Sequence, residues 1–173
     1  MSNLVWGSVA DWISGLGALA AVVTALYLSR ADQRISLRGY CGFRMIAGPG
    51  VPPNEYLLIS VTNVGRRATT LNNVGMRTGL WMNKNAVITA PKDFISDGIP
   101  VEIKDGEVRK WAIPMGEDRK WLHDLAETFV TSKLQARLLR FYVWTTHGTA
   151  KRDKPERVVV DAIIAALEDT NRS

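Results

Sequence analysis

The longest apolar stretch of the chain lies near its N-terminus. From Trp12 to Ser29 the sequence reads WISGLGALAAVVTALYLS without a charged residue, and Asp11 and Arg30 bound it. As a helix, these 18 residues extend about 27 Å, close to the hydrocarbon thickness of a bilayer. A helix that covers a soluble core would show a polar face, and this stretch has none. We therefore predict a membrane-spanning helix rather than a buried core helix.

The flanks of this stretch favour a retained anchor over a cleaved signal peptide. A signal peptide carries Lys or Arg before its apolar run and small residues at a cleavage site after it. The first eleven residues hold no Lys or Arg, and the run leaves through Tyr27-Leu28-Ser29-Arg30.

Arginines follow the apolar stretch and none precedes it. The residues that we expect to set the topology are Arg30, Arg34, Arg38 and Arg44. Because Lys and Arg are retained on the cytoplasmic side, we predict a single-pass protein of the cell inner membrane, with its N-terminus outside and its C-terminal domain in the cytoplasm. The single cysteine, Cys41, is compatible with a reducing compartment and excludes a disulfide framework.

Small residues recur on the apolar stretch at intervals of four, three and four residues, which places them in one stripe along a helix. Gly17 lies beside this stripe. The candidate association residues are Ser14, Gly17, Ala18, Ala21 and Ala25. Small residues let two helices approach closely in lipid, so the anchor can form a homo-oligomer. Alanine and glycine are also common in any membrane helix, and both interpretations stay open. Asp11 follows Ser8 at capping-box spacing, which favours a helix cap over a carboxylate inside the bilayer.

Beyond residue 34 the sequence changes to short segments with alternating or β-branched apolar residues. Glu55–Thr62 (EYLLISVT) is the clearest strand, with a Gly/Pro-rich loop predicted before it at 47–54 and a turn after it at 63–66. Further strands are predicted at Thr69–Leu80 and Ala86–Thr89 as one hairpin, and at Ile99–Lys104 and Glu107–Ile113 as another around Asp105-Gly106.

Two helices are expected among these strands. Glu117–Lys133 places its apolar residues on one helical stripe. Glu156–Glu168 does the same after the strand Arg137–Thr146, although its residues 158–160 (VVV) could instead extend a strand. The predicted fold is thus an N-terminal transmembrane helix followed by a mainly-β domain, an antiparallel β-sandwich with one or two packed helices. We divide the chain into residues 1–34, the tail, anchor and basic exit, and residues 35–173, the sandwich domain.

Two strand-and-turn segments carry a resemblance. Residues 60–68 read SVTNVGRRA and residues 141–148 read FYVWTTHG. With the N-terminal apolar helix and its arginine-rich exit, this arrangement resembles a loose set of uncharacterised bacterial and phage single-pass membrane proteins. The resemblance covers most of the chain and implies an immunoglobulin-like cytoplasmic domain. It implies no activity.

The sequence offers little catalytic chemistry. His123 and His147 are the only histidines, and neither lies in a zinc-binding spacing. Nucleophile-elbow, phosphate-loop and dinucleotide-binding motifs are absent. Cys41 lies in a predicted strand and is expected to be a packed thiol, and loop acids such as Asp93 with Asp97 are expected to be solvated. We therefore expect no enzyme activity, no cofactor, no metal and no catalytic residue.

The formal net charge is +5, with 22 basic and 17 acidic residues. Basic pairs such as Arg66-Arg67 and Arg119-Lys120 are spread along the chain, and acids stand beside several of the basic groups, which favours a solvated surface over one patch on the anionic inner leaflet. Trp111, Trp121 and Trp144 are expected in the core rather than in a basic groove, so no specific nucleic acid is predicted.

These features lead to two function hypotheses. The first is a non-enzymatic, membrane-anchored protein-interaction module, whose partners are the bilayer, an unidentified protein and a second copy through the anchor. The alternative is a membrane-acting phage or defence effector, of the superinfection-exclusion or abortive-infection type, whose anchors self-associate. An enzyme would need a deep pocket that holds Cys41, a histidine or paired acids within hydrogen-bond reach.

Overall fold

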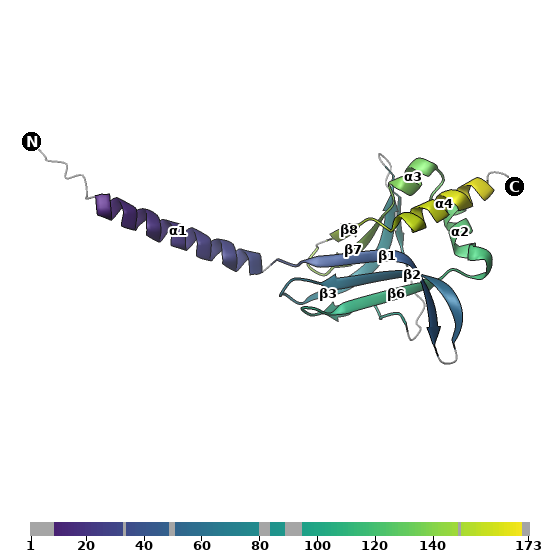
Figure 1. Cartoon of the computed structure of the whole chain (residues 1–173), viewed down its shortest axis with the longest axis horizontal. Helices are drawn as coiled ribbons and strands as arrows, with labels where there is room; N and C mark the ends of the chain where they lie inside the picture. Colours follow the sequence, from purple (N-terminus) through teal and green to yellow (C-terminus); the bar gives the residue numbers. More distant parts are fainter. Residues whose placement is uncertain are drawn as a thin grey trace, which may run out of the picture. The chain divides into compact units, whose positions relative to one another are not determined.

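The computed structural model describes residues 9–32, 34–48, 51–79, 84–88, 95–148 and 150–170. The chain divides into two compact units, Met1–Arg34 and Ile35–Ser173. The first unit contains helix α1 (Val9–Asp32), and the second contains the strands and the remaining helices (Figure 1). An apolar N-terminal helix followed by an antiparallel, mainly-β domain confirms the predicted fold class.

The described strands of the domain form two antiparallel sheets. One sheet has the order β1-β2-β6, built from Leu37–Gly48, Val51–Asn63 and Val108–Pro114. The other has the order β4-β3-β7-β8, with β5 pairing with β3; its strands are Lys84–Val87, Thr69–Thr78, Arg140–Thr145, Ala150–Asp153 and, for β5, Val101–Ile103.

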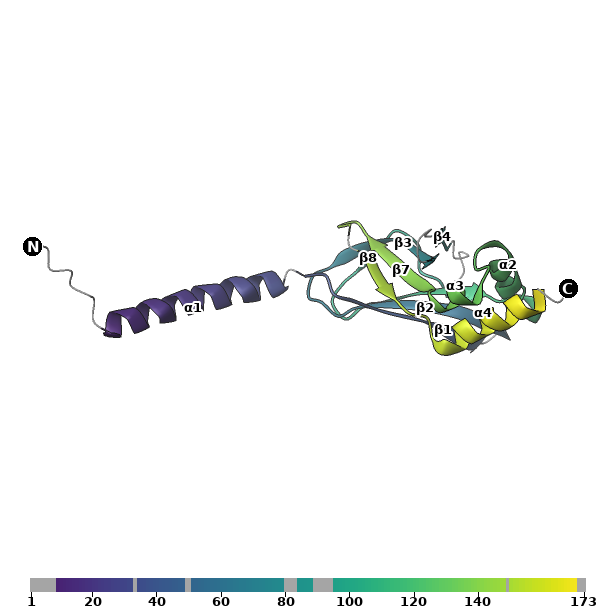
Figure 2. The ribbon, with the colours of Figure 1, turned by 90° about the horizontal axis from the view of Figure 1, so that it is seen from above.

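The helices of the domain gather at one end of the two sheets. They are the short 3₁₀ turn η1 (Glu117–Arg119) and the α-helices α2 (Lys120–Thr128), α3 (Lys133–Arg137) and α4 (Arg157–Thr170). Figures 1 and 2 show α2, α3 and α4 together at this end, opposite the turn that joins β2 to β3. Alternating apolar residues in the strands and apolar stripes on the helices therefore bury one common core.

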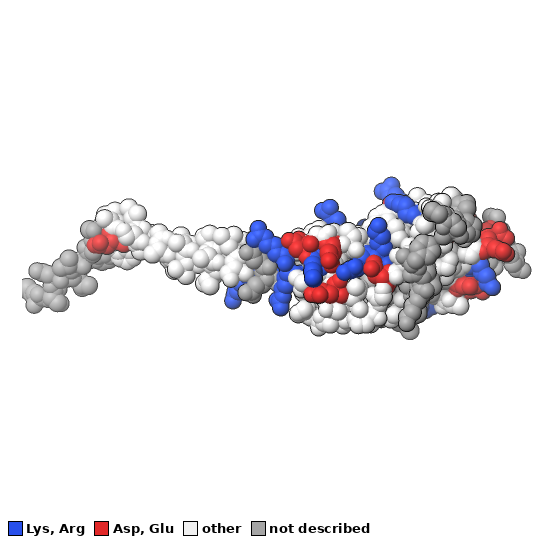
Figure 3. All heavy atoms as spheres, turned by 90° about the horizontal axis from the view of Figure 1, so that it is seen from below, with Lys and Arg blue, Asp and Glu red and all other residues white. Residues whose placement is uncertain are grey.

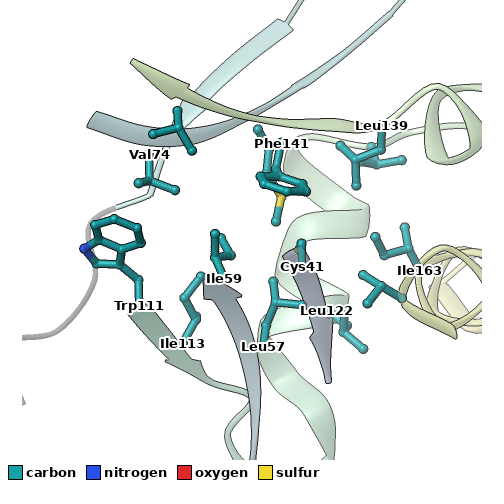
Figure 4. Close-up of a cluster of buried hydrophobic side chains, with 14 of the residues drawn as sticks. Cys41, Leu57, Ile59, Val74, Trp111, Ile113, Leu122, Leu139, Phe141 and Ile163 are labelled. Atoms are coloured by element: carbon teal, nitrogen blue, oxygen red, sulfur yellow. The ribbon is translucent and has the colours of Figure 1, made fainter. Parts of the chain in front are cut away.

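Side chains from both sheets meet in this core. Figure 4 shows Ile59 and Trp111 of one sheet facing Phe141 of the other, and Leu122 of α2 and Ile163 of α4 close the end where the helices lie. These five side chains are at most 2% exposed. Strand β7 shows the expected alternation, because Phe141 and Val143 are buried while their neighbours are partly exposed.

The segment between β8 and α4 closes the outer edge of β1 and so joins the two sheets. The Gly39 amide donates to Asp153 Oδ2 at 3.0 Å, and the Glu156 amide donates to the Cys41 carbonyl at 2.9 Å. A Cβ at residue 39 would lie 2.7 Å from Asp153 Oδ2 and from the Phe141 ring, so glycine is needed for this close approach.

The outer edge of β6 is closed by a short segment rather than by a strand. The Asp97 amide donates to the Lys110 carbonyl at 2.8 Å, and the Lys110 amide donates back to Asp97 Oδ2 at 2.6 Å. Ser96 Oγ accepts from the Ala112 amide at 3.1 Å. Side-chain oxygens thus occupy edge groups that could otherwise pair with another chain.

Two predictions about how the strands are connected are wrong. In the loop predicted at 47–54, residues 47–48 and 51–54 instead continue the two strands, because Ile46 pairs with Asn54 and Gly48 with Val51, while residues 49–50 lie outside the described ones. Strand β6 pairs with β2 only from Tyr56 onward, so the prolines at 52 and 53 lie where β2 has no described second neighbour. The Asp105-Gly106 turn forms, but β5 pairs with β3 and β6 pairs with β2. The turn therefore connects the two sheets instead of closing a hairpin.

The helix predicted at Glu117–Lys133 is interrupted. Helix α2 ends at Thr128, and α3 begins at Lys133 after its N-cap Ser132, whose Oγ accepts from the Gln135 amide at 3.2 Å. Between them Val130 is fully buried, and burying it turns the chain out of the helical path. The predicted helix at Glu156–Glu168 is confirmed as α4, whereas β8 was not predicted.

Candidate functional site

Helix α1 is the most distinctive chemical feature of the chain. Among the described residues, Val9–Arg30 is the one helical segment long and apolar enough to cross a membrane, and the mean hydropathy over an 18-residue window of it is 1.7. None of this 22-residue segment is buried. Large side chains are exposed on all sides of the helix, including Leu16 at 64%, Leu19 at 61% and Val22 at 56%. Figure 3 shows no charged side chain along the middle of α1.

The small residues of the predicted association stripe lie on one continuous helix. At about 100° per residue, Ser14, Ala18, Ala21 and Ala25 fall within an arc of about 60°, and Gly17 borders it. Ala20 lies about 100° away from Ala21 on the same helix. A Cβ built on Gly17 would meet no described atom within 4 Å, so this face is open to a partner helix.

The four arginines of the predicted topology signal occupy different environments. Arg30 lies in the last turn of α1, and Arg34 follows the helix. Arg38 and Arg44 both belong to β1 and are exposed. Arg44 makes an ion pair with Glu156 at 3.4 Å and stacks over the Tyr40 ring at 4.7 Å, so it also fixes the start of α4 against β1.

Cys41 lies beneath this ion pair. Its side chain is 1% exposed, and burial, with a smaller contribution from the Glu156 carboxylate, raises the pKa of the thiol to about 12. Burial and the same carboxylate also raise the pKa of Tyr40. A protonated, enclosed thiol is a poor nucleophile, and this agrees with the predicted packed cysteine.

A shallow basic hollow lies where α3, β7 and the start of α4 meet. It has a volume of about 290 Å³, and its charged lining is Arg137, Arg140, Lys154, Arg157 and Asp161. Arg140 Nη1 already donates to the carbonyls of Leu139 at 2.7 Å and Arg137 at 3.3 Å. The hollow therefore offers positive charge at the surface rather than an enclosed binding site.

The remaining titratable candidates serve local structure. Asp97 caps the edge of β6 and lies 3.5 Å from Arg109, while Asp93 is outside the described residues. His147 Nδ1 lies 3.3 Å from Thr69 Oγ1 in the turn after β7. Within the described ranges, no group of three His, Cys, Asp or Glu side chains could hold a metal ion.

The tryptophans divide between the core and the surface. Trp111 is 1% exposed and confirms its predicted core position, and Trp121 is partly buried against the core. Trp144 is an exception, because it lies partly exposed on the outer face of β7, stacked on Tyr142 with ring centroids 5.6 Å apart. The prediction that Trp144 lies in the core is wrong, since buried Val143 precedes it and strand neighbours point to opposite faces.

One structural residue was not recognised in the sequence. Asn63 was predicted only as a turn residue, but its side chain is fully buried. Its Nδ2 donates to the Arg67 carbonyl at 2.8 Å and the Ile103 carbonyl at 3.2 Å, and its Oδ1 accepts from the Gly65 amide at 3.0 Å. Asn63 thus ties the β2–β3 turn to β5. The Asn-x-Gly spacing is the signal for its local bond to Gly65, and no local pattern encodes the bond to Ile103.

The described residues present an exposed apolar helix and a compact β domain. The chain matches no protein-family model, and no curated protein matches it.

Proposed function

We propose that this chain is a membrane-anchored, non-enzymatic protein-interaction module of the bacterial inner membrane. The carrying observation is α1, a helix that is apolar on every side and contributes none of its span to the domain core. An exposed apolar surface of this extent is unfavourable in water and favourable in lipid, where the helix also satisfies its own backbone hydrogen bonds. The domain then supplies the soluble part that meets a partner.

The proposed orientation places the domain in the cytoplasm and the N-terminus outside. It is supported by Arg30 and Arg34, which immediately follow the apolar span, and by Arg38 and Arg44 within the first strand. All four lie within about 15 residues of the end of the span, the range over which basic residues set topology.

We also propose that the domain is an immunoglobulin-like sandwich. The strand order supports this: β1, β2 and β6 match strands A, B and E, and β4, β3, β7 and β8 match C′, C, F and G. Strand β5 takes the place of D in sequence but pairs with β3. Immunoglobulin-like domains commonly serve recognition, although fold alone does not assign a function.

Reporter fusions test the anchor and its orientation together. A reporter that is active only in the cytoplasm, fused after Ser173, should be active, and a periplasm-only reporter at the same place should be silent. The control is the same pair of fusions on a chain that begins at Ser36. Activity of the periplasmic reporter on the full chain would overturn the orientation, and release of the full chain from membranes by salt would overturn the anchor.

A second candidate function is the membrane-acting phage or defence effector whose anchors self-associate. The observation that favours it is the small-residue stripe, which α1 presents on one open face. Ala21→Leu should separate the helix backbones and weaken crosslinking between copies, whereas Ala20→Leu, which makes the same change about 100° away, should leave it intact. Equal crosslinking of both variants would remove the support for this candidate.

A further inference from the structure

The turn between β2 and β3 is fixed to the point where the chain enters the domain. We call residues 64–68 the basal turn. The amides of Val64 and Gly65 donate to the Ser36 carbonyl at 2.8 and 3.1 Å. Asn63 holds the other side of the turn through the Arg67 carbonyl, and its own carbonyl accepts from the Gly106 amide at 3.0 Å. The basal turn and the β5–β6 turn therefore share one end of the domain with Ser36.

This end combines cationic and apolar side chains. Its exposed basic residues are Arg38, Arg66, Arg67 and Lys104. Val64 is 53% exposed on the basal turn, and Val108 is 44% exposed where β6 begins. We call these six residues the basal surface. Exposed apolar side chains among cations are typical of surfaces that lie at a membrane interface.

Two of the acids at this end are already engaged within the domain. Glu107 Oε2 accepts from the Lys104 amide and from Arg109 Nη2, both at 3.0 Å. Asp153 Oδ2 accepts from the Gly39 amide on the edge of β1. Asp105 is also exposed in the β5–β6 turn, so three carboxylates stand against the four cations of the basal surface and Arg109, and they offset the positive charge only in part.

The connection between α1 and β1 is short. From Asp32 to Leu37 the chain can span at most about 18 Å, whatever its path. Ser36 lies inside that connection and is hydrogen-bonded to the basal turn. If α1 spans the bilayer, Arg66 and Arg67 are thus tethered within a short distance of the headgroup layer, where anionic lipids attract cations most strongly.

We infer that the basal surface docks on the headgroups of anionic phospholipids, an inference that rests on the proposed insertion of α1. Arg38, Arg66 and Arg67 meet lipid phosphates, and Val64 lies at the boundary between headgroups and acyl chains. The opposite end of the domain, which carries α2 to α4 (Figure 2), then faces away from the lipid and is presented to a protein partner.

Spin labels on the full chain test this docking. Nitroxides at Ala68→Cys on the basal turn, at Leu134→Cys on α3 and at Leu19→Cys in α1 are compared in nanodiscs of phosphatidylcholine with and without about 30% phosphatidylglycerol. Cys41 is not labelled because it is buried and its pKa is about 12. Collision rates with lipid-soluble oxygen and a water-soluble nickel complex report the depth of each label.

The label at residue 68 should gain oxygen contact and lose nickel contact only when phosphatidylglycerol is present, and the label at residue 134 should not change. Arg66→Gln with Arg67→Gln should lower the docked-to-undocked ratio by about 30-fold, since each near-surface arginine contributes about 1 kcal/mol. Both side chains are exposed, and the bond from Asn63 uses the Arg67 carbonyl, so the fold should be kept. The matched control, Lys120→Gln with Arg137→Gln at the helical end, removes the same charge and should leave docking unchanged.

The three labels separate the possible failures. The label at residue 19 can lie in lipid while the label at residue 68 is equally exposed to water in both nanodiscs. That result would overturn the docking and keep the anchor. A residue 19 label exposed to water would overturn the proposed function itself. Equal loss of docking in the arginine pair and in the control pair would overturn the basal surface as the specific contact, and leave only a dependence on net charge.

Discussion

Helix α1 and the β domain use the same kinds of apolar side chain in opposite ways. Leu19 in α1 is 61% exposed, whereas Leu57 in β2 is fully buried. The domain alternates apolar and polar residues along its strands and encloses its own core, but α1 is apolar all round and has no second layer to pack on. The comparison teaches that alternating apolar residues enclose a core, whereas an all-round apolar helix leaves its surface exposed, as the proposed membrane anchor requires.

The largest expected difference between the two regions comes from one substitution made in both. Leu57→Ala leaves a cavity between the sheets and should lower the free energy of unfolding of the domain by about 4 kcal/mol. Leu19→Ala makes the same change in α1 and should leave domain unfolding unchanged, because the two regions are separate units. Urea unfolding of each full-length variant in nanodiscs, followed by β-sheet circular dichroism, measures both. An equal loss in the two variants would mean that α1 is part of the domain's core.

A smaller effect is expected at the residue that organises the basal turn. Asn63→Leu removes three hydrogen bonds from a buried site and leaves the Arg67 and Ile103 carbonyls without their donor, which should cost about 3 kcal/mol. Asn54→Leu is the matched control, because Asn54 is exposed on the same strand. Urea midpoints of the two variants measure the difference, and an Asn63→Leu protein as stable as the control would show that these bonds do not hold the turn.

The smallest effect concerns the thiol under the β1 edge. Because burial raises the pKa of Cys41 to about 12 in the folded chain, the unfolded chain loses its thiol proton first as the pH rises above about 9. Cys41 therefore stabilises the fold fully below pH 9, and this contribution should fall by about 1.4 kcal/mol between pH 8 and pH 10 and vanish near pH 12. Comparison with Cys41→Ala isolates the thiol from other titrating groups. Parallel stability profiles of the two proteins would contradict the enclosed, protonated thiol.

Local periodicity was sufficient to predict the apolar helix α1, most strands and α4. The apolar run of α1 and the stripe Val159, Ile163 and Leu167 are contained within single segments, so no tertiary information was needed. Partner choice was not predictable in the same way. The Asp105-Gly106 turn is typical of a hairpin, yet β5 pairs with β3 and β6 with β2, in different sheets, and no pattern local to the turn encodes these partners.

The residues that hold the functional surfaces in place depend on long-range contacts. Asn63 reaches Ile103, and Asp153 reaches Gly39 across two sheets. The basal surface likewise combines residues from β1, the basal turn and the β5–β6 turn, which are brought together only by folding. Charge near the apolar stretch is the basis of the proposed orientation, but it does not identify which domain residues would face the lipid.

Hydrogen exchange of the full chain in lipid nanodiscs tests the contrast between α1 and the domain most directly. We predict that backbone amides within Val9–Arg30 are protected by the bilayer, which excludes water, and exchange far more slowly than the amides of the exposed basal turn. Amides in the domain core strands should show the same protection in the full chain in nanodiscs and in a chain that begins at Ser36 in buffer. Rapid exchange of the α1 amides in nanodiscs, or loss of core-strand protection in the chain that begins at Ser36, would contradict an independent domain carried on a membrane-spanning helix.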